Sequence, residues 1–141
     1  KNLINLESKN GLNEINSYIN FQLKIDQISI SFLNFLIEKK MKKKKIIAYG
    51  AAAKGNTLLN YCGVKDNSFI DFVVDKSPHK QNKYLPGSRI KVKSELHIKK
   101  FKPDYIIIFP WNLKTEIINQ LNYTKKWGAK FVTVIPKITI H

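Results

Sequence analysis

The sequence predicts an α/β domain: a doubly wound, mostly parallel sheet of five strands, preceded by a long N-terminal helix. Three observations support this fold class. Short apolar runs alternate with helix-like segments, the first such run ends in a glycine loop, and the run that follows Asp104 and ends at Phe109 is apolar throughout. An uninterrupted apolar strand is typical of a central strand covered on both faces. Alternating strands and helices imply right-handed crossovers and therefore parallel neighbours.

The length of 141 residues leaves room for one domain with its own core. We divide the chain into an N-terminal region, 1–43, and an α/β domain, 44–141. Because it begins at Lys1 and its single methionine is Met41, we interpret it as part of a longer protein. No apolar stretch reaches the roughly 20 residues that a membrane-spanning helix requires. The single cysteine excludes an internal disulfide, and we expect a cytoplasmic protein with no membrane partner.

The formal net charge of +15 suggests a nucleic-acid partner, but the kind of cation argues against one. Arg89 is the only arginine, and arginine is the residue preferred for bidentate contacts to bases and phosphates. The lysine run from Lys39 to Lys45 is typical of a solvated helix end, where cations also interact favourably with the helix dipole. A basic nucleic-acid-binding or scaffold module is therefore only the third interpretation of this chain.

The first predicted element is a helix from Leu12 to about Lys42, after a polar segment, 1–11, that we expect to be frayed. Apolar residues recur there at alternating spacings of three and four, as in a heptad repeat: Tyr18, Phe21, Ile25, Ile28, Phe32 and Phe35. Five more widen the stripe beyond a narrow seam: Ile15, Ile19, Leu33, Leu36 and Ile37. We expect this stripe to be buried against a neighbouring domain or in a homodimer formed through residues 12–37. Packing along its own sheet is the alternative.

The remaining elements alternate. Strands are predicted at 45–50, 69–74, 104–109 and 130–135, with a short strand at most at 90–92. A short helix at 55–62 ends at Gly63, and a helix turn capped by Ser94 extends through Lys99. A longer helix from Leu113 to Trp127 ends at Gly128.

The most informative segment joins the first strand to the next helix and has the pattern Gly50-x-Ala52-x-x-Gly55. Small residues at this spacing, between strand and helix, are typical of a phosphate loop in a Rossmann-like fold, with alanine tolerated in the second position. Gly50 allows a sharp turn, Ala52 lets the backbone approach a phosphate, and Gly55 lets the helix pack close to the sheet. Twenty residues after Gly55 comes Asp75, where an acidic residue commonly accepts hydrogen bonds from a ribose.

Ligands of doubly wound sheets bind beyond the carboxyl ends of the strands, where the strand order reverses. Three predicted loops meet there, at 50–56, 75–80 and 110–113. They carry the candidate nucleotide- and substrate-binding residues Gly50, Ala51, Ala52, Lys54, Gly55, Asn56, Asp75, Lys80, Trp111 and Asn112.

Several of these residues have an equally good structural interpretation. Asp75 could cap the turn at Ser77 instead of binding ribose, and Asn112 could cap the following helix. Trp111 could stack on a base or belong to the core. A flexible cation such as Lys54 beside N–H donors suits a pyrophosphate, but lysine is also common on exposed loops. We predict no catalytic residue and no metal ligand in this chain.

Taken in order, these segments resemble the C-terminal domain of the S-adenosylmethionine-dependent sugar-nucleotide (NDP-hexose) C-methyltransferases. The resemblance covers about 45–136 closely and rests on residues 49–63, 74–81, 84–87, 103–105, 110–112 and 134–136. The family often has glycine where Asn82 stands, and asparagine tolerates the left-handed backbone conformation. It also often has proline where Lys91 stands, at the edge of the third predicted strand.

The resemblance implies a part of a transferase of deoxysugar biosynthesis. This domain would hold a nucleotide-linked sugar, while an upstream methyltransferase domain would carry the catalytic residues and the S-adenosylmethionine site. The sequence contains neither an acidic-glycine loop for that cofactor nor a Cys-x-x-Cys zinc motif, so we expect no cofactor in this chain. The alternative is an NAD(H)-binding domain of an oxidoreductase or regulatory protein, supported by the same glycine loop and Asp75.

Overall fold

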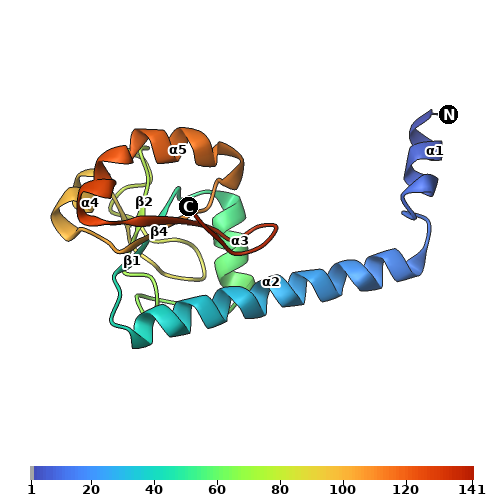
Figure 1. Cartoon of the computed structure of the whole chain (residues 1–141), viewed down its shortest axis with the longest axis horizontal. Helices are drawn as coiled ribbons and strands as arrows, with labels where there is room; N and C mark the ends of the chain where they lie inside the picture. Colours follow the sequence, from blue (N-terminus) through green and yellow to red (C-terminus); the bar gives the residue numbers. More distant parts are fainter. Residues whose placement is uncertain (1) are drawn as a thin grey trace.

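The computed structural model describes residues 2–141 as an α/β domain with a long helix extending from it (Figure 1). The strands are β1 (Ile46–Tyr49), β2 (Val73–Val74), β3 (Val92–Lys93), β4 (Tyr105–Ile108), β5 (Lys130–Thr133) and β6 (Thr139–Ile140). They form one sheet in the order β3-β2-β1-β4-β5-β6, in which only β6 is antiparallel to its neighbour. The predicted fold class is therefore confirmed, with one strand more than the sequence predicts.

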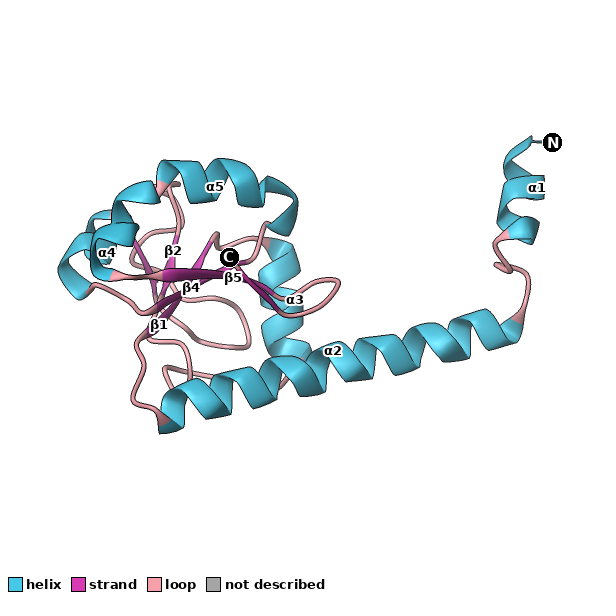
Figure 2. Ribbon diagram, viewed as in Figure 1, coloured by secondary structure: helices cyan, strands magenta, loops and turns pink. Residues whose placement is uncertain are grey.

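Helices cover both faces of this sheet (Figure 2). They are α1 (Asn2–Lys9), α2 (Ile15–Met41), α3 (Ala53–Tyr61), α4 (Leu96–Phe101) and α5 (Lys114–Gln120), with 3₁₀ helices at η1 (Trp111–Leu113) and η2 (Asn122–Trp127). Helices α2 and α3 pack on one face, and α4 and α5 pack on the other.

Strand β1 shows why its four residues are all apolar or aromatic. Ile46 and Ala48 face the core under α2 and α3, whereas Ile47 and Tyr49 face the core under α4 and α5. Successive side chains of a strand point to opposite faces, so a central strand needs apolar residues at every position. This places the glycine loop, which follows Tyr49 directly, at the centre of the sheet.

The chain differs from the predicted elements in several places. The predicted strand at 69–74 shortens to Val73–Val74, because Asp71 pairs with Ile46 through its carboxylate as well as its backbone. The predicted helix at 113–127 is divided into η1, α5 and η2, although it ends at Gly128 as expected. The last strand, Thr139–Ile140, is not predicted; it pairs with Val132 and Thr133.

Two positions noted in the sequence behave as their residue types allow. Asn82 has φ +63°, so the asparagine adopts the left-handed conformation that its residue type tolerates. Lys91 is not part of β3, which begins at Val92. Instead, it forms an isolated antiparallel bridge with Tyr84. The loop before β3 therefore folds despite both departures.

The N-terminal segment is helical rather than frayed over its described part. Helix α1 covers Asn2–Lys9, although none of its residues is buried; Lys1 lies outside the described residues. Within residues 2–141, no helix combines the length and apolar character needed to cross a bilayer.

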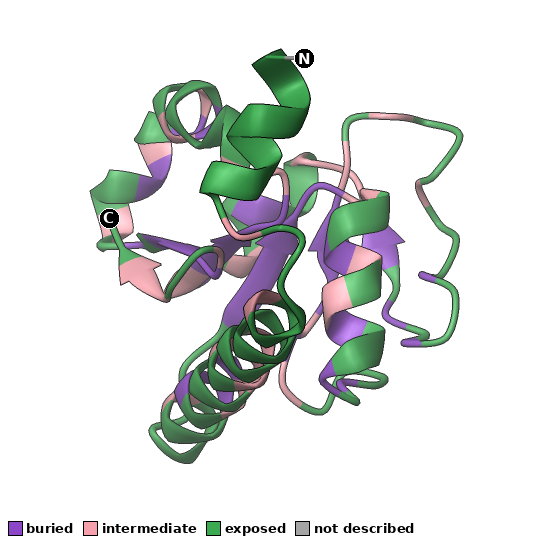
Figure 3. Cartoon of the chain, turned by 90° about the vertical axis from the view of Figure 1, so that its right-hand side faces the viewer, coloured by how far each residue is buried: buried purple, intermediate pink, exposed green. Residues whose placement is uncertain are grey.

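The long predicted helix is confirmed as α2, but its apolar stripe is divided. Phe32, Phe35 and Leu36 are buried against the domain's own sheet. In the other half of the helix, Ile19 and Phe21 remain 54% and 62% exposed. Figure 3 shows this change from buried to exposed along the helix. We call the exposed part, residues 2–24, the helical arm.

Candidate functional site

The glycine loop lies where the strand order of the sheet reverses. Strand β1 has β2 on one side and β4 on the other, and such a switch point is the usual ligand site of this architecture. The crevice there, about 200 Å³ in volume, is lined by residues of all three predicted loops, among them Gly50, Asp75 and Pro110. The structure thus brings the three loops together at one edge of the sheet.

Two glycines of the loop have a clear steric role. Gly50 has φ +92°, and its N–H donates to Val74 O at 2.7 Å. A Cβ atom on Gly50 would lie 2.6 Å from Pro110 Cδ. A Cβ atom on Gly55 would lie 2.6 Å from Phe109 Cβ and would overlap the ring as well. The loop after β4 therefore packs so closely that only glycine fits at either position.

Asp75 braces the glycine loop. Its Oδ2 accepts a hydrogen bond from the Ala51 N–H at 2.7 Å, and its Oδ1 accepts one from the Ser77 N–H at 2.8 Å. The Lys80 ammonium lies 3.4 Å from Oδ2 and donates to Ala51 O at 3.0 Å. The capping of the turn at Ser77 is thus present, and ribose binding by Asp75 stays a prediction.

A second group of predicted residues gathers on the β4 side of the loop. The Lys54 ammonium lies 5.2 Å from the centre of the Trp111 ring and 3.4 Å from Asn112 Oδ1. Asn112 does not cap the following helix, because no side-chain cap forms at the start of either η1 or α5. Lys54 and Trp111 line an apolar cavity of about 470 Å³ that continues between α2 and α3.

The start of α3 has donors without side-chain partners. Its N-cap residue is Ala52, and no side chain caps the first turn. The first N–H groups of a helix have no partner within the helix, so they are free to meet an anion here. In the same turn, Asn56 Oδ1 is buried and has no hydrogen-bond partner among residues 2–141.

Sequence reasoning missed a polar cluster that borders the crevice. The Tyr49 hydroxyl donates to Glu95, and the Gln120 amide donates to Tyr49 Oη at 2.9 Å and to Glu95 Oε1 at 2.6 Å. Burial raises the pKa of Tyr49, and the hydrogen bond to Glu95 raises it further, so the hydroxyl stays protonated at neutral pH. A tyrosine ending a buried strand is a signal that a polar partner is needed, but sequence does not identify the partner.

The geometry defines the chain as a Rossmann-like α/β domain whose strand–glycine-loop–helix unit stands at the switch point. More particularly, it belongs to the family of C-methyltransferase C-terminal domains, which matches residues 1–136. This confirms the family that the sequence motifs resemble.

Two known proteins are similar to the chain. The C-methyltransferase NovU of Streptomyces niveus is 37% identical over 94 residues, which are 67% of this chain and 22% of that protein. The chain thus matches about a fifth of that relative. Among solved structures, UDP-D-quinovosamine 4-dehydrogenase from Vibrio fischeri has a TM-score of 0.50 and 19% identity, over 67% of this chain and 79% of that one. At this identity the likeness shows the fold alone.

Proposed function

We propose that this domain binds a nucleotide-linked sugar for an S-adenosylmethionine-dependent sugar C-methyltransferase of deoxysugar biosynthesis. The methyl donor and the catalytic residues would belong to an upstream domain. The observation that carries the proposal is the uncapped start of α3, directly after Gly50–Ala52, with the Lys54 ammonium beside Trp111. The family membership supports the methyltransferase part.

The start of α3 is suited to phosphate for two reasons. Its unpaired N–H groups lie at the N-terminus of the helix, which is the positive end of the helix dipole. A negatively charged group is stabilised there. Lys54, in the first turn, adds a full positive charge, and its only close polar neighbour among the described side chains is the neutral Asn112. A pyrophosphate at this position would therefore gain both hydrogen bonds and charge neutralisation.

The cavity beside Trp111 is suited to the rest of the nucleotide. Aromatic side chains stack on bases, and tryptophan offers a large apolar face. Its partly buried ring borders the 470 Å³ cavity together with Leu58 and Tyr61. The NAD(H) alternative is less well supported, because the chain belongs to a family of C-methyltransferase domains.

We expect thymidine diphosphate to bind the chain in a calorimetric titration, with NADH as the comparison. A nucleoside diphosphate that fits the loop should give saturable heat, while NADH should give little. Absence of binding up to about 1 mM, equivalent to about −4 kcal/mol, would contradict the proposal. Saturable fluorescence enhancement of NADH would favour the oxidoreductase alternative.

Lys54→Ala is expected to weaken nucleotide binding by roughly 1–3 kcal/mol, as for loss of a charge-assisted contact. Folding should hardly change, because Lys54 is exposed. Calorimetry and thermal unfolding measure the two effects, and Lys65→Ala, also at an exposed lysine, is the matched control. If Lys54→Ala unfolded the chain and left the affinity of the folded fraction unchanged, the lysine would be structural.

The helical arm is the proposed contact with a partner domain. In a full-length enzyme we expect the catalytic domain to cover it, and in the isolated chain we expect a second copy to do so in a two-fold dimer. Five of its exposed apolar side chains lie on α2: Ile15, Tyr18, Ile19, Phe21 and Leu23. Burying them at about 1.5–3 kcal/mol each is comparable with an association cost of about 4–15 kcal/mol.

Self-association through the arm is testable by sedimentation. The wild-type chain is expected to form dimers at micromolar concentration, and Ile19→Lys/Phe21→Lys is expected to be monomeric and folded. Both positions are exposed, so the substitutions should leave the core intact. A wild-type chain that stayed monomeric at high micromolar concentration would contradict the dimer.

A further inference from the structure

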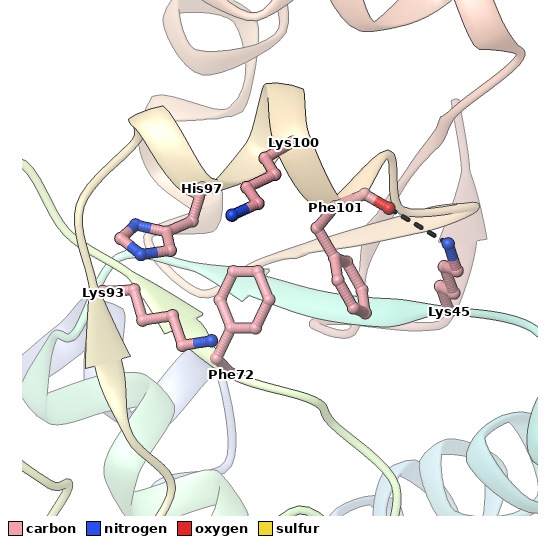
Figure 4. Close-up of a pocket in the computed structure, with 6 residues that line it drawn as sticks. All are labelled: Lys45, Phe72, Lys93, His97, Lys100 and Phe101. Carbon is pink, nitrogen blue, oxygen red and sulfur yellow. Dashed lines mark hydrogen bonds between the residues drawn. The ribbon is translucent and has the colours of Figure 1, made fainter.

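A second pocket lies beside α4 and shares no lining residue with the glycine-loop crevice (Figure 4). Its volume is about 340 Å³, and it is lined by Lys45, Phe72, Lys93, His97, Lys100 and Phe101. We infer that this pocket binds a small phosphate-bearing ligand whose phosphate is linked to an apolar or planar group.

The floor of the pocket is a rigid aromatic shelf. Phe72 is 2% exposed and belongs to the core under α4 and α5. The Phe101 ring meets it edge to face, with 5.0 Å between the ring centres. Because Phe72 comes from the segment before β2 and Phe101 ends α4, the shelf is held by two separate elements. Phe72 holds the shelf in place from the core, and the partly exposed Phe101 ring offers the preformed surface for the apolar part of a ligand.

Basic side chains lie around this shelf. The Lys93 ammonium lies 4.3 Å from the centre of the Phe72 ring, and the Lys45 ammonium lies 5.1 Å from that of Phe101. Figure 4 shows the amino groups of Lys93 and Lys100 and the imidazole of His97 gathered around Phe72. The only polar contact of Lys45 to the shelf is a hydrogen bond to Phe101 O at 3.2 Å.

The carboxylates nearest in sequence point to other partners. Asp71 accepts from the Ile46 N–H at 3.0 Å, and Glu95 accepts from Tyr49 and Gln120. Asp104 accepts from the Lys45 backbone N–H and pairs with the neighbouring Lys44 ammonium.

Consequently, the Lys93 and Lys100 ammonium groups lack counter-ions. Across residues 2–141, no ion pair includes Lys45, Lys93 or Lys100. Like charges gathered around one pocket repel one another, although solvent screens the exposed Lys45 and Lys100 in part, and a bound anion removes the repulsion that is left. Cation–aromatic contacts offset part of this repulsive energy but do not neutralise the charges.

Phosphate fits this arrangement better than other anions. It carries up to two negative charges and three acceptor oxygens, so it can meet several ammonium groups at once, and lysine binds phosphate as a point charge. A concave pocket with an apolar floor suits a small molecule rather than a nucleic-acid backbone.

Phenyl phosphate is the probe that combines both features. It is titrated into the ¹⁵N-labelled chain, with phenol and inorganic phosphate as separate probes for the two halves. We expect saturable shifts of the amide signals of residues 93–101, with a dissociation constant of about 1 mM or lower. Phenol and phosphate alone should bind at least about tenfold more weakly, since each uses half of the site.

A charge-matched pair of variants tests the residues. Lys93→Gln/Lys100→Gln is expected to weaken phenyl phosphate binding by about tenfold or more, from the loss of two charge-assisted contacts. Lys125→Gln/Lys126→Gln, at exposed positions of η2, lowers the net charge equally and should leave the affinity within about twofold. Lys54→Ala should have no effect on these signals, which separates this site from the nucleotide site.

Three outcomes would overturn the inference. The first is an absence of saturable shifts at residues 93–101 up to about 10 mM phenyl phosphate. The second is an equal loss of affinity in the two double variants, which would show attraction to the net charge alone. The third is a shift of the same amide signals on addition of duplex DNA but not of phenyl phosphate, with a DNA affinity that falls steeply as the salt concentration rises.

Discussion

Gly55→Val is expected to cause the largest loss of stability of any single change in the glycine loop. Gly55 is buried, and even a methyl group there would lie 2.6 Å from Phe109 Cβ and overlap the ring. Overpacking of this kind costs roughly 1–3 kcal/mol and occasionally more. Valine adds two further methyl groups, so the helix has to move away from the sheet. We expect the free energy of unfolding to fall by at least about 3 kcal/mol, which is a large part of a typical stability of about 5–15 kcal/mol.

Urea unfolding measures this loss, and Gly63→Ala is the matched control. Gly63 has φ +67° but nothing within 4 Å of an added Cβ atom, so alanine there costs only the backbone strain of about 1–2 kcal/mol. In the folded fraction, Gly55→Val should also weaken nucleotide binding, because α3 carries the donors of the proposed phosphate site. Equal losses of stability in the two variants would contradict the close-packing role of Gly55.

Phe32→Ala is expected to destabilise the chain by roughly 3–5 kcal/mol, as usual for removal of a buried phenylalanine. The same change at Phe21, eleven residues earlier in the same helix, should stay within about 0.5 kcal/mol. The reason is position: Phe32 is 0% exposed against the sheet, and Phe21 is 62% exposed on the arm. Both substitutions have the same small effect on helix propensity, so the comparison isolates packing.

Thermal or urea unfolding at low protein concentration is the appropriate measurement, because self-association would add stability to the wild type. A strong, concentration-independent loss in Phe21→Ala would mean that the arm packs on its own domain. A loss that appears only at high protein concentration would instead agree with dimerisation through the arm.

Much of the fold could be predicted because the relevant information is local. Apolar residues at every position of 105–109 require a strand covered on both faces, and the structure has β4 there. The spacing of Gly50 and Gly55 requires a tight strand–helix junction. The structure supplies the neighbours, Pro110 and Phe109, that leave no room for a side chain. The two-residue strands β2, β3 and β6 were predicted least well, because two residues are too few to show a periodic pattern.

Within the candidate site, the sequence identified the loops but not the contacts between them. That the loops after β1, β2 and β4 meet follows from the parallel order of the strands. Only tertiary structure decides that Asp75 bonds Ala51, 24 residues away, or that Lys54 meets Asn112, 58 residues away. The Tyr49, Glu95 and Gln120 cluster joins three elements in the same way.

The sequence by itself determined the order of elements, the glycine loop and the family, because each depends on residues close together in the chain. The tertiary structure alone decided how much of α2 is core and how much is arm. Hydrophobic periodicity shows which side of a helix is apolar, but not how far the sheet beneath it extends. Here the core includes Phe32 and Phe35, with Ile28 packed against it, whereas Tyr18 and Phe21, in the same stripe, remain exposed.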